Sequence, residues 1–333
     1  MEYKVKEITI YGNSTAKISE FYESFNVNDD EVLIETELTL MSNGSEVYHF
    51  KGKFEKGFHW ENIKYPTSTG YALVGKIIKA GKRTNFEIGE RVFARGNHKS
   101  IQKLGLDRVF KIPTNIKPEY AVWTPILRTA DNAIRLSGVL IGQKVVIMGL
   151  GIFGLSVLQY AYLAGASKIV VVEPNEFRIE LAKRIYSNII AIKGKVEDKI
   201  DEIGDDAYAV FDCTGQAYTL DIAGFILRNH GKVILISDNP NYSKQIVGRQ
   251  ILMKYLQIFG VHMNMNDTYQ PNAFYPLSVY DIHKSIYSYI DEGRINIDKM
   301  ITHRLTPEEA KDMYYLLEKG NYQSAGILID WKK

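Results

Sequence analysis

The stretch from Lys144 to Gly154, KVVIMGLGIFG, decides the fold of this chain. Its first half is an apolar run typical of a buried strand, and the apolar residues after it have the spacing of a helix that continues to about Ala164. Between them, the first glycine of G-x-G-x-x-G permits a tight turn, the second lets the backbone approach a pyrophosphate, and the third lets helix and strand pack closely. The N-terminus of the helix then faces the negative charge. The stretch therefore predicts the first strand, turn and helix of a dinucleotide-binding unit.

The residues that follow alternate between strands and helices in the same way. A strand KIVVVE and a helix through Ile185 are followed by AYAVFDCTG, a further helix, and GKVILIS. Strands that are apolar on both faces, as in IVVV and VILI, indicate a parallel sheet covered by helices on each side. We therefore expect a doubly wound parallel-sheet Rossmann domain.

The first third of the chain has a different pattern. Up to about Pro113, short alternating runs such as VLIETELTL and YALVGKIIKAG are separated by Gly, Asn and Asp turn residues, which indicates an irregular β-barrel. After LQIFGV the strand–helix alternation stops, and a helix near 278–292 precedes a final strand, GILIDW, that we expect to rejoin the first part. We expect an α/β fold class, with a β-barrel domain at 1–120 and 269–333 and a Rossmann domain at 121–268.

The end of the second expected Rossmann strand indicates which dinucleotide binds. Glu173 can accept hydrogen bonds from both hydroxyls of an adenosine ribose and would repel a 2′-phosphate, so NAD is expected rather than NADP. Arg178 can stack on adenine, reach a phosphate, or lie on an exposed helix face. The alternative is that the glycines only serve a tight turn and that Glu173 is a solvated strand end. The expected cofactor-binding residues are Gly149, Gly151, Ile152, Phe153, Gly154, Glu173, Pro174, Asn175, Arg178, Thr214, Gly215, Ile236 and Ser237.

Composition excludes several classes of partner. The 333 residues include 41 Lys and Arg against 39 Asp and Glu, and a net charge of +2 provides no field that would hold nucleic acid or an anionic membrane. The single cysteine, Cys213, permits no internal disulfide and no cysteine metal cluster, and a small apolar filler is its expected role. The N-terminal residues lack the apolar core of a signal peptide. We expect a cytoplasmic protein that acts on a small molecule, with no nucleic-acid or membrane partner.

Four further segments carry a family resemblance. They are LMSNGSE at 40–46, GYALVG at 70–75, GERV at 89–92 and ITHR at 301–304. With the glycine motif, the chain resembles the medium-chain dehydrogenase/reductase superfamily over nearly its whole length. The resemblance implies a GroES-like catalytic domain built from both chain ends, and a homodimer or homotetramer joined through the Rossmann domains, with LQIFGV near the sheet edge.

The departures from the family pattern concern its catalytic zinc. The family's zinc cysteine is matched by Asn43, its histidine by Tyr71, the neighbouring glutamate by Ala72, and a third ligand position by Thr124. A zinc site needs about three Cys, His or carboxylate ligands at converging positions. The chain therefore resembles the zinc-free branch of the superfamily, and no metal is expected.

Without a metal, a hydrogen-bond or proton donor must act on the substrate oxygen. Tyr71 is the first candidate because it takes the place of a zinc histidine. Ser45 matches the family's hydroxyl residue that contacts substrate oxygen, Tyr48 follows where a proton relay can continue, and His98 lies in a stretch resembling the loop that lines the substrate pocket. The alternatives are that Tyr71 only fills space, that Ser45 caps a helix, and that His98 is a solvated loop residue.

Two further residues are candidates for contact with the substrate. Asn43 stands at the former cysteine position, and Arg128 can hold a carboxylate or phosphate of the substrate, unless it pairs with Asp131 along one helix. The leading hypothesis is hydride transfer between NAD(H) and a secondary alcohol or its ketone, such as a sugar or polyol derivative. Reduction of an activated carbon–carbon double bond and a non-catalytic NAD(H)-binding sensor or scaffold are the alternatives.

Overall fold

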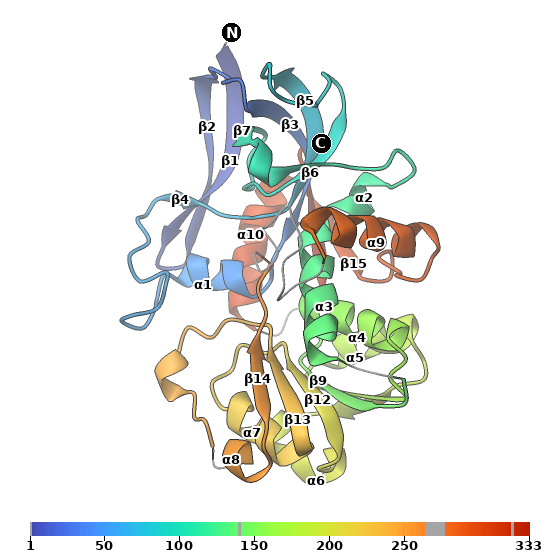
Figure 1. The fold of residues 1–333 in the computed structure, drawn as a ribbon. Helices are drawn as coiled ribbons and strands as arrows, with labels where there is room; N and C mark the ends of the chain where they lie inside the picture. The colour runs from blue at the N-terminus through green and yellow to red at the C-terminus, as the bar shows by residue number, and fades with distance from the viewer. Residues whose placement is uncertain (1, 139–140, 249, 264–276, 321–322) are drawn as a thin grey trace. The chain divides into compact units, whose positions relative to one another are not determined.

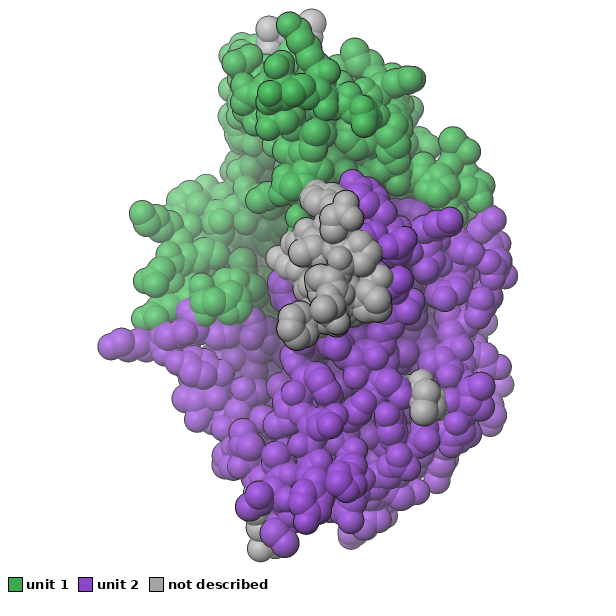
Figure 2. Space-filling model, viewed as in Figure 1, with its two compact units in different colours: residues 1–53, 59–124, 301–333 green, residues 54–58, 125–300 purple. Residues whose placement is uncertain are grey.

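The computed structural model describes residues 2–138, 141–248, 250–263, 277–320 and 323–333. The chain forms two compact units, coloured separately in Figure 2. Unit 1 comprises Met1–Lys53, His59–Thr124 and Ile301–Lys333, and unit 2 comprises Phe54–Phe58 and Pro125–Met300. The expected domain boundary at 120/121 stays a prediction, and the one at 268/269 lies outside the described residues.

Unit 2 contains a six-stranded sheet in the order β11-β10-β9-β12-β13-β14, in which every neighbouring pair is parallel (Figure 1). From the inner strand β9, the chain first adds β10 and β11 on one side. It then crosses over and adds β12, β13 and β14 on the other side of β9. This reversal is the switch point of a doubly wound sheet, so the expected fold class is confirmed. The strands are β9 (Lys144–Met148), β10 (Lys168–Glu173), β11 (Ile190–Lys193), β12 (Ala207–Asp212), β13 (Leu227–Leu235) and β14 (Gln257–Gly260).

Helices follow the strands of this sheet, as the apolar pattern predicts. Val145, Val146, Ile147 and Met148 of β9 are all fully buried, because a central parallel strand is covered on both faces. The helices are α3 (Thr124–Ser137), α4 (Ile152–Leu163), α5 (Glu176–Ile185), α6 (Ile200–Ile203), α7 (Thr219–Ile226), α8 (Gln250–Met253) and α9 (Val279–Asp291), with short 3-10 turns η2 (Val196–Asp198) and η3 (Tyr242–Lys244).

Unit 1 contains two β-sheets. The smaller has the order β2-β1-β4, and the larger has the order β15-β16-β3-β5-β6-β8, with β7 also paired to β3. Strand β16 lies antiparallel to β3 and parallel to β15, so the C-terminal residues rejoin the N-terminal part as expected. The strands are β1 (Glu2–Gly12), β2 (Thr15–Ser24), β3 (Glu31–Met41), β4 (Thr67–Ser68), β5 (Leu73–Ala80), β6 (Arg91–Ala94), β7 (Ile101–Gly105), β8 (Val109–Lys111), β15 (Ile301–Leu305) and β16 (Gly326–Asp330).

The helical elements of unit 1 are α1 (Ser45–Lys51), α2 (Pro118–Ala121), α10 (Pro307–Glu318) and the 3-10 turn η1 (Leu106–Arg108). Phe50 of α1 stacks on Tyr314 of α10 with 5.5 Å between ring centroids, and both side chains are fully buried. They share a core with Ile8 of β1 and Ile327 of β16. This packing brings α1 and α10 together although more than 250 residues separate them in the sequence.

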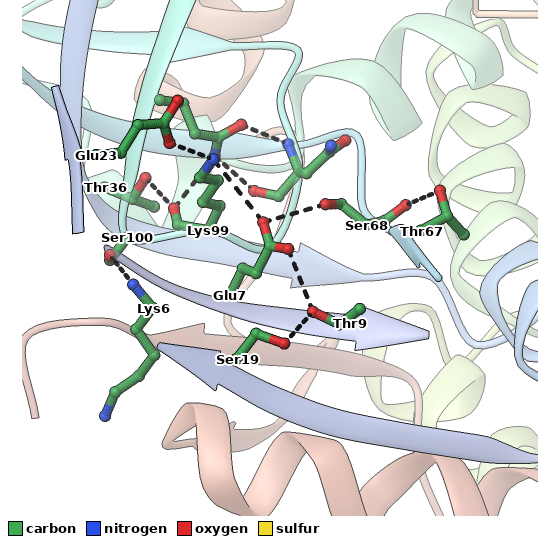
Figure 3. A network of polar contacts seen from close by, with 12 residues as sticks. Lys6, Glu7, Thr9, Ser19, Glu23, Thr36, Thr67, Ser68, Lys99 and Ser100 are labelled. Carbon is green, nitrogen blue, oxygen red and sulfur yellow. Dashed lines mark hydrogen bonds and ion pairs between the residues drawn. The ribbon is translucent and has the colours of Figure 1, made fainter. Parts of the chain in front are cut away.

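A polar network fixes the loop between β6 and β7 against β1 (Figure 3). The ammonium group of Lys99 lies 3.2 Å from a carboxylate oxygen of Glu23 and 3.9 Å from one of Glu7. The backbone N–H of Ile8 donates to the carbonyl of His98 at 3.0 Å, and the N–H of Ser100 donates to the carbonyl of Lys6 at 2.8 Å. His98, whose own carbonyl is one of these anchors, therefore has a fixed position in unit 1.

No helix in the described part of the chain is both long and apolar enough to cross a membrane.

Candidate functional site

The glycine turn of unit 2 has the geometry that its sequence predicts. Gly149 has φ +87°, a conformation that other residues rarely adopt, and its N–H donates to the carbonyl of Val172 on β10 at 2.9 Å. A Cβ at Gly154 would lie 1.9 Å from the carbonyl oxygen of Gly149, so only glycine permits this contact between α4 and the turn. A Cβ at Gly151, by contrast, would meet nothing within 4 Å. The turn therefore has one open position, at the residue that precedes α4.

Glu173 closes one side of this turn. Its carboxylate accepts hydrogen bonds from the N–H of Leu150 at 2.7 Å and from the N–H of Asn175 at 3.0 Å. The guanidinium of Arg178 is 4.0 Å away. Glu173 is 3% exposed, so the alternative of a solvated strand end is wrong. The carboxylate instead orders the turn that would hold the cofactor.

The other expected cofactor residues lie near the same edge of the sheet. Ile152 and Phe153 form the first turn of α4, while Pro174 and Asn175 follow β10, and the Asn175 side chain caps α5 by accepting from the N–H of Phe177 at 3.0 Å. The N–H groups of Ile236 and Ser237, after β13, lie 3.0 and 3.3 Å from the carbonyl of Asp212. Thr214 and Gly215 follow β12 after one intervening residue, Cys213. The fold thus brings strand-end residues together from β9, β10, β12 and β13.

The candidate proton donor Tyr71 lies in unit 1, just before β5. Burial raises the pKa of its phenol well above the usual range, and hydrogen bonding with the Ser42 and Ser45 side chains lowers it only in part. The hydroxyl groups of Ser42 and Ser45 are 2.9 Å apart. Three hydroxyl groups therefore form a cluster, and Tyr71 keeps its proton at neutral pH.

Ser45 is the first residue of α1 and does not cap it. The N-cap is Gly44, which makes no side-chain capping bond. The helix-cap alternative for Ser45 is therefore wrong. Tyr48 lies in the middle of α1, where its carbonyl accepts the N–H of Gly52 at 3.0 Å.

Asn43, which the resemblance places at the family's zinc cysteine, lies between β3 and α1. Its amide nitrogen donates to the carbonyl of Ala325 at 2.8 Å and to the hydroxyl of Ser324 at 3.2 Å. These bonds tie the residues after β3 to the residues just before β16. Asn43 therefore has a structural role here, and its contact with substrate stays a prediction.

His98 is fully buried, so the alternative of a solvated loop residue is wrong. Its Nε2 is 2.9 Å from a carboxylate oxygen of Glu46, and its Nδ1 is 2.8 Å from the hydroxyl of Thr39. The imidazole of His98 also lies close to the backbone of residue 70. This position requires glycine, because a Cβ there would lie 2.9 Å from the ring. The indole N–H of Trp331 donates to the same Thr39 oxygen at 3.0 Å. Thr39 and Glu46 therefore hold the two ring nitrogens of His98 in place.

Glu46 joins several elements of unit 1. One carboxylate oxygen accepts the N–H of Ser42 at 2.7 Å, and the other accepts from His98, from the hydroxyl of Tyr314 at 2.5 Å and from that of Thr69 at 3.3 Å. Burial alone would raise the pKa of Glu46, but the charge and hydrogen bond of His98, with the bonds from Ser42 and Tyr314, hold it below its usual value. Glu46 therefore remains a carboxylate directly beside the hydroxyl cluster.

Glu46 and its partner on α10 are missing from the sequence-based candidates. The acid after Ser45 in the first turn of α1 is a visible signal, and Thr306 with Glu309 forms a capping box that marks the start of α10. Neither signal says that Tyr314 meets Glu46, because that contact spans 268 positions.

Asn43 and Thr124, which the resemblance places at two zinc-ligand positions, make other hydrogen bonds. Among the residues that the structure describes, no group of three or more His, Cys, Asp or Glu side chains could hold a metal ion. Asn43 donates to a backbone carbonyl, and Thr124 donates its hydroxyl to the carbonyl of Ala121 at 2.6 Å. Each oxygen of Glu46 already accepts hydrogen bonds.

Arg128 on α3 is 1% exposed and donates to the carbonyl of Met263. The alternative of a pair between Arg128 and Asp131 is not supported, because Asp131 pairs with Arg135 at 2.5 Å, four residues farther along the helix. Burial raises the pKa of Asp131, and the hydrogen bond and charge of Arg135 oppose that shift. A role of Arg128 in substrate binding stays a prediction.

Comparison with known proteins finds similar dehydrogenases. Residues 153–275 match the family model described as zinc-binding dehydrogenase. The L-threonine 3-dehydrogenase of Marinomonas sp. (strain MWYL1) is 25% identical over 82% of this chain and 87% of its own length. These comparisons support the medium-chain dehydrogenase/reductase superfamily for this chain.

Solved structures of dehydrogenases share the fold over 98% of the chain. A Sinorhizobium meliloti 1021 protein bound to NADP has a TM-score of 0.80 at 18% identity, covering 98% of this chain and 99% of its own. An alcohol dehydrogenase of Escherichia coli CFT073, solved with NADH, has a TM-score of 0.80 at 19% identity with the same coverage. The relatives indicate an oxidoreductase of the dehydrogenase type.

Proposed function

We propose that this medium-chain dehydrogenase/reductase transfers hydride between NAD(H) and a secondary alcohol or its ketone, without a catalytic zinc. The observation that carries the proposal is the turn from Gly149 to Gly154, open at Gly151 and ordered by the buried carboxylate of Glu173. A bound nicotinamide would supply the hydride donor or acceptor. The threonine dehydrogenases similar to this chain support a secondary alcohol, because carbon 3 of threonine carries one.

NAD is proposed rather than NADP because of Glu173. Its two hydrogen bonds with backbone N–H groups keep the carboxylate at the end of β10, where it can accept from a ribose hydroxyl and would repel a 2′-phosphate. Thermal unfolding in the presence of NAD, NADH, NADP and NADPH tests this, since a ligand that binds the native state raises Tm. A rise with NAD and NADH alone is expected, and a larger rise with NADPH would contradict the choice.

Tyr71 is proposed as the donor to the substrate oxygen. Because its pKa is raised, the phenol keeps its proton at neutral pH and can donate a hydrogen bond to an oxygen that gains negative charge. Ser42 and Ser45 can reorient around it, and Ser45 is the second candidate for contact with that oxygen. Arg128 is proposed as a substrate-binding residue, and its substitution should change KM. Tyr48 is proposed as a proton-relay residue, and its substitution should change kcat.

The chemistry is tested with purified protein, metal analysis and a panel of secondary alcohols, sugar and polyol derivatives, ketones and enones. Tyr71→Phe should lower kcat on the best substrate about 10²- to 10³-fold, the usual effect of losing one oxyanion donor. Tyr22→Phe is the matched control, since Tyr22 is 67% exposed on β2. Turnover of enones alone would favour double-bond reduction, and NADH binding with no turnover of any compound would favour a sensor or scaffold.

We also propose that the protein is a cytoplasmic homodimer or homotetramer joined through β14. Among the described strands, β13 is the one neighbour of β14, so no described strand pairs with the other edge of β14. Leu252, Tyr255 and Ile258, at and just before this strand, are exposed. Light scattering should give a multiple of 38.0 kDa, and Ile258→Lys should shift the mass toward the monomer; a monomeric wild type would refute the proposal.

A further inference from the structure

Two buried carboxylates end the two strands that flank β9. Strand β10 ends at Glu173 and strand β12 ends at Asp212, and both strands run parallel to β9 as its direct neighbours. Both side chains are 3% exposed. Because parallel strands end at the same edge of a sheet, the two carboxylates lie on either side of the turn that starts at Gly149.

Asp212 accepts hydrogen bonds from three donors. Its Oδ1 accepts the N–H of Thr214 at 2.9 Å and the hydroxyl of Thr214 at 2.7 Å, and its Oδ2 accepts the hydroxyl of Thr219 at the start of α7. The Thr214 hydroxyl in turn accepts the N–H of Gln216 at 3.1 Å. One carboxylate thus fixes both ends of the loop from β12 to α7. Burial raises the pKa of Asp212, while the bonds from Thr219 and Thr214 lower it.

This loop packs on the glycine turn. A Cβ at Gly149 would lie 3.2 Å from the carbonyl oxygen of Cys213 and 3.2 Å from the methyl carbon of Thr214. The N–H of Cys213 donates to the carbonyl of Met148, the last residue of β9, at 2.9 Å. The position of Gly149 therefore depends on the conformation of the loop that Asp212 fixes.

We propose that Asp212 is a positioning residue for the cofactor, which acts through Thr214 and Thr219 to fix the glycine turn from the β12 side, as Glu173 fixes it from the β10 side. The inference rests on the proposed binding of NAD(H). According to this inference, Asp212 and Thr219 increase the affinity for the cofactor although neither needs to contact it. Preorganising the turn removes the ordering cost that binding would otherwise carry.

The test is a fluorescence titration with NADH of the full-length wild type, Asp212→Ala, Thr219→Val and Thr219→Ser. Asp212→Ala and Thr219→Val should each raise Kd for NADH about tenfold or more, the equivalent of one lost hydrogen bond to a charged group. Thr219→Ser keeps the hydroxyl and should bind like the wild type. Ile203→Val, a core substitution in α6, is the control for general destabilisation and should leave Kd unchanged.

Three outcomes would overturn the inference. The first is that Thr219→Val and every folded Asp212 variant bind within about twofold of the wild type, although their Tm falls. The second is that Ile203→Val raises Kd as much as Thr219→Val. The third is that the wild type binds no nicotinamide nucleotide at all, which would refute the proposed function as well, whereas the first two leave it intact.

Discussion

Replacing Glu46 with glutamine is expected to destabilise unit 1 strongly. The carboxylate accepts from Ser42, His98, Tyr314 and Thr69 and is 3% exposed. Glutamine keeps the shape but turns one acceptor oxygen into an NH₂ group. If that group faces His98, Tyr314 and Thr69, three donors lose their acceptor inside the unit.

The size of the expected stability loss follows from the burial of the Glu46–His98 pair. Removing one partner of a buried, hydrogen-bonded ion pair costs about 3–5 kcal/mol. We expect about 3 kcal/mol for Glu46→Gln, because the Gln oxygen can still accept the N–H of Ser42. At roughly 2–4 °C per kcal/mol for a domain of this size, Tm should fall by roughly 6–12 °C.

The effect should depend on pH in one direction. The pKa of Glu46 in the folded protein lies below its usual value of 4.5, so the carboxylate binds fewer protons in the folded than in the unfolded state. Its contribution to the free energy of unfolding is therefore full above pH 4.5 and is lost as the pH falls through the folded pKa. The difference in stability between wild type and Glu46→Gln should shrink over that acidic range.

Calorimetry from pH 7 down to the acid limit measures both effects. Glu308→Gln is the control, because its ion pair with Lys6 at 2.7 Å is exposed and should contribute less than about 1 kcal/mol. A loss of less than about 1 kcal/mol for Glu46→Gln at pH 7, or a difference that grows toward acid pH, would refute the reasoning.

Further predictions concern the glycine turn, the Thr39 network and the metal. Gly151→Ala should leave Tm unchanged but weaken NADH binding in a titration, because the added methyl group meets no protein atom and lies at the open position of the turn; unchanged affinity would contradict this. Gly154→Ala should lower Tm as well, since its methyl group would overlap the carbonyl oxygen of Gly149 and overpacking costs typically about 1–3 kcal/mol. Trp331→Phe removes the indole donor to Thr39 and should cost about 1 kcal/mol in urea unfolding, and a stability equal to the wild type would rule out a role for that bond. Dialysis against a chelator should leave Tm and turnover unchanged, and restoration of lost activity by zinc would refute the zinc-free mechanism.

The sequence predicts the parts of the fold that depend on local chemistry. The glycine spacing from Gly149 to Gly154 follows from φ angles and close contacts within one turn, and the apolar runs in β9, β10 and β13 follow from burial on both faces. The importance of Glu173 is predictable for the same reason, because it ends the next strand of the same unit. Helix α10 is absent from the sequence-based expectations, although its capping box is a local signal.

Side chains that meet across long sequence separations are decided only by the tertiary structure. His98 is buried because Lys99 and its neighbours fix the loop on β1 and because Gly70 leaves room for the ring. The residues next to His98 in the sequence would be compatible with either a solvated or a buried side chain. They therefore do not predict its environment.

The same distinction holds for the carboxylates that organise the two candidate sites. The sequence by itself determined that the chain carries a dinucleotide turn with an acid at the end of the next strand, because turn geometry and strand period are local properties. Only the tertiary structure decided that Glu46 meets Tyr314 and that the loop after Asp212 packs on Gly149. Those contacts depend on how the sheets and helices of each unit pack, which no spacing within a single segment specifies.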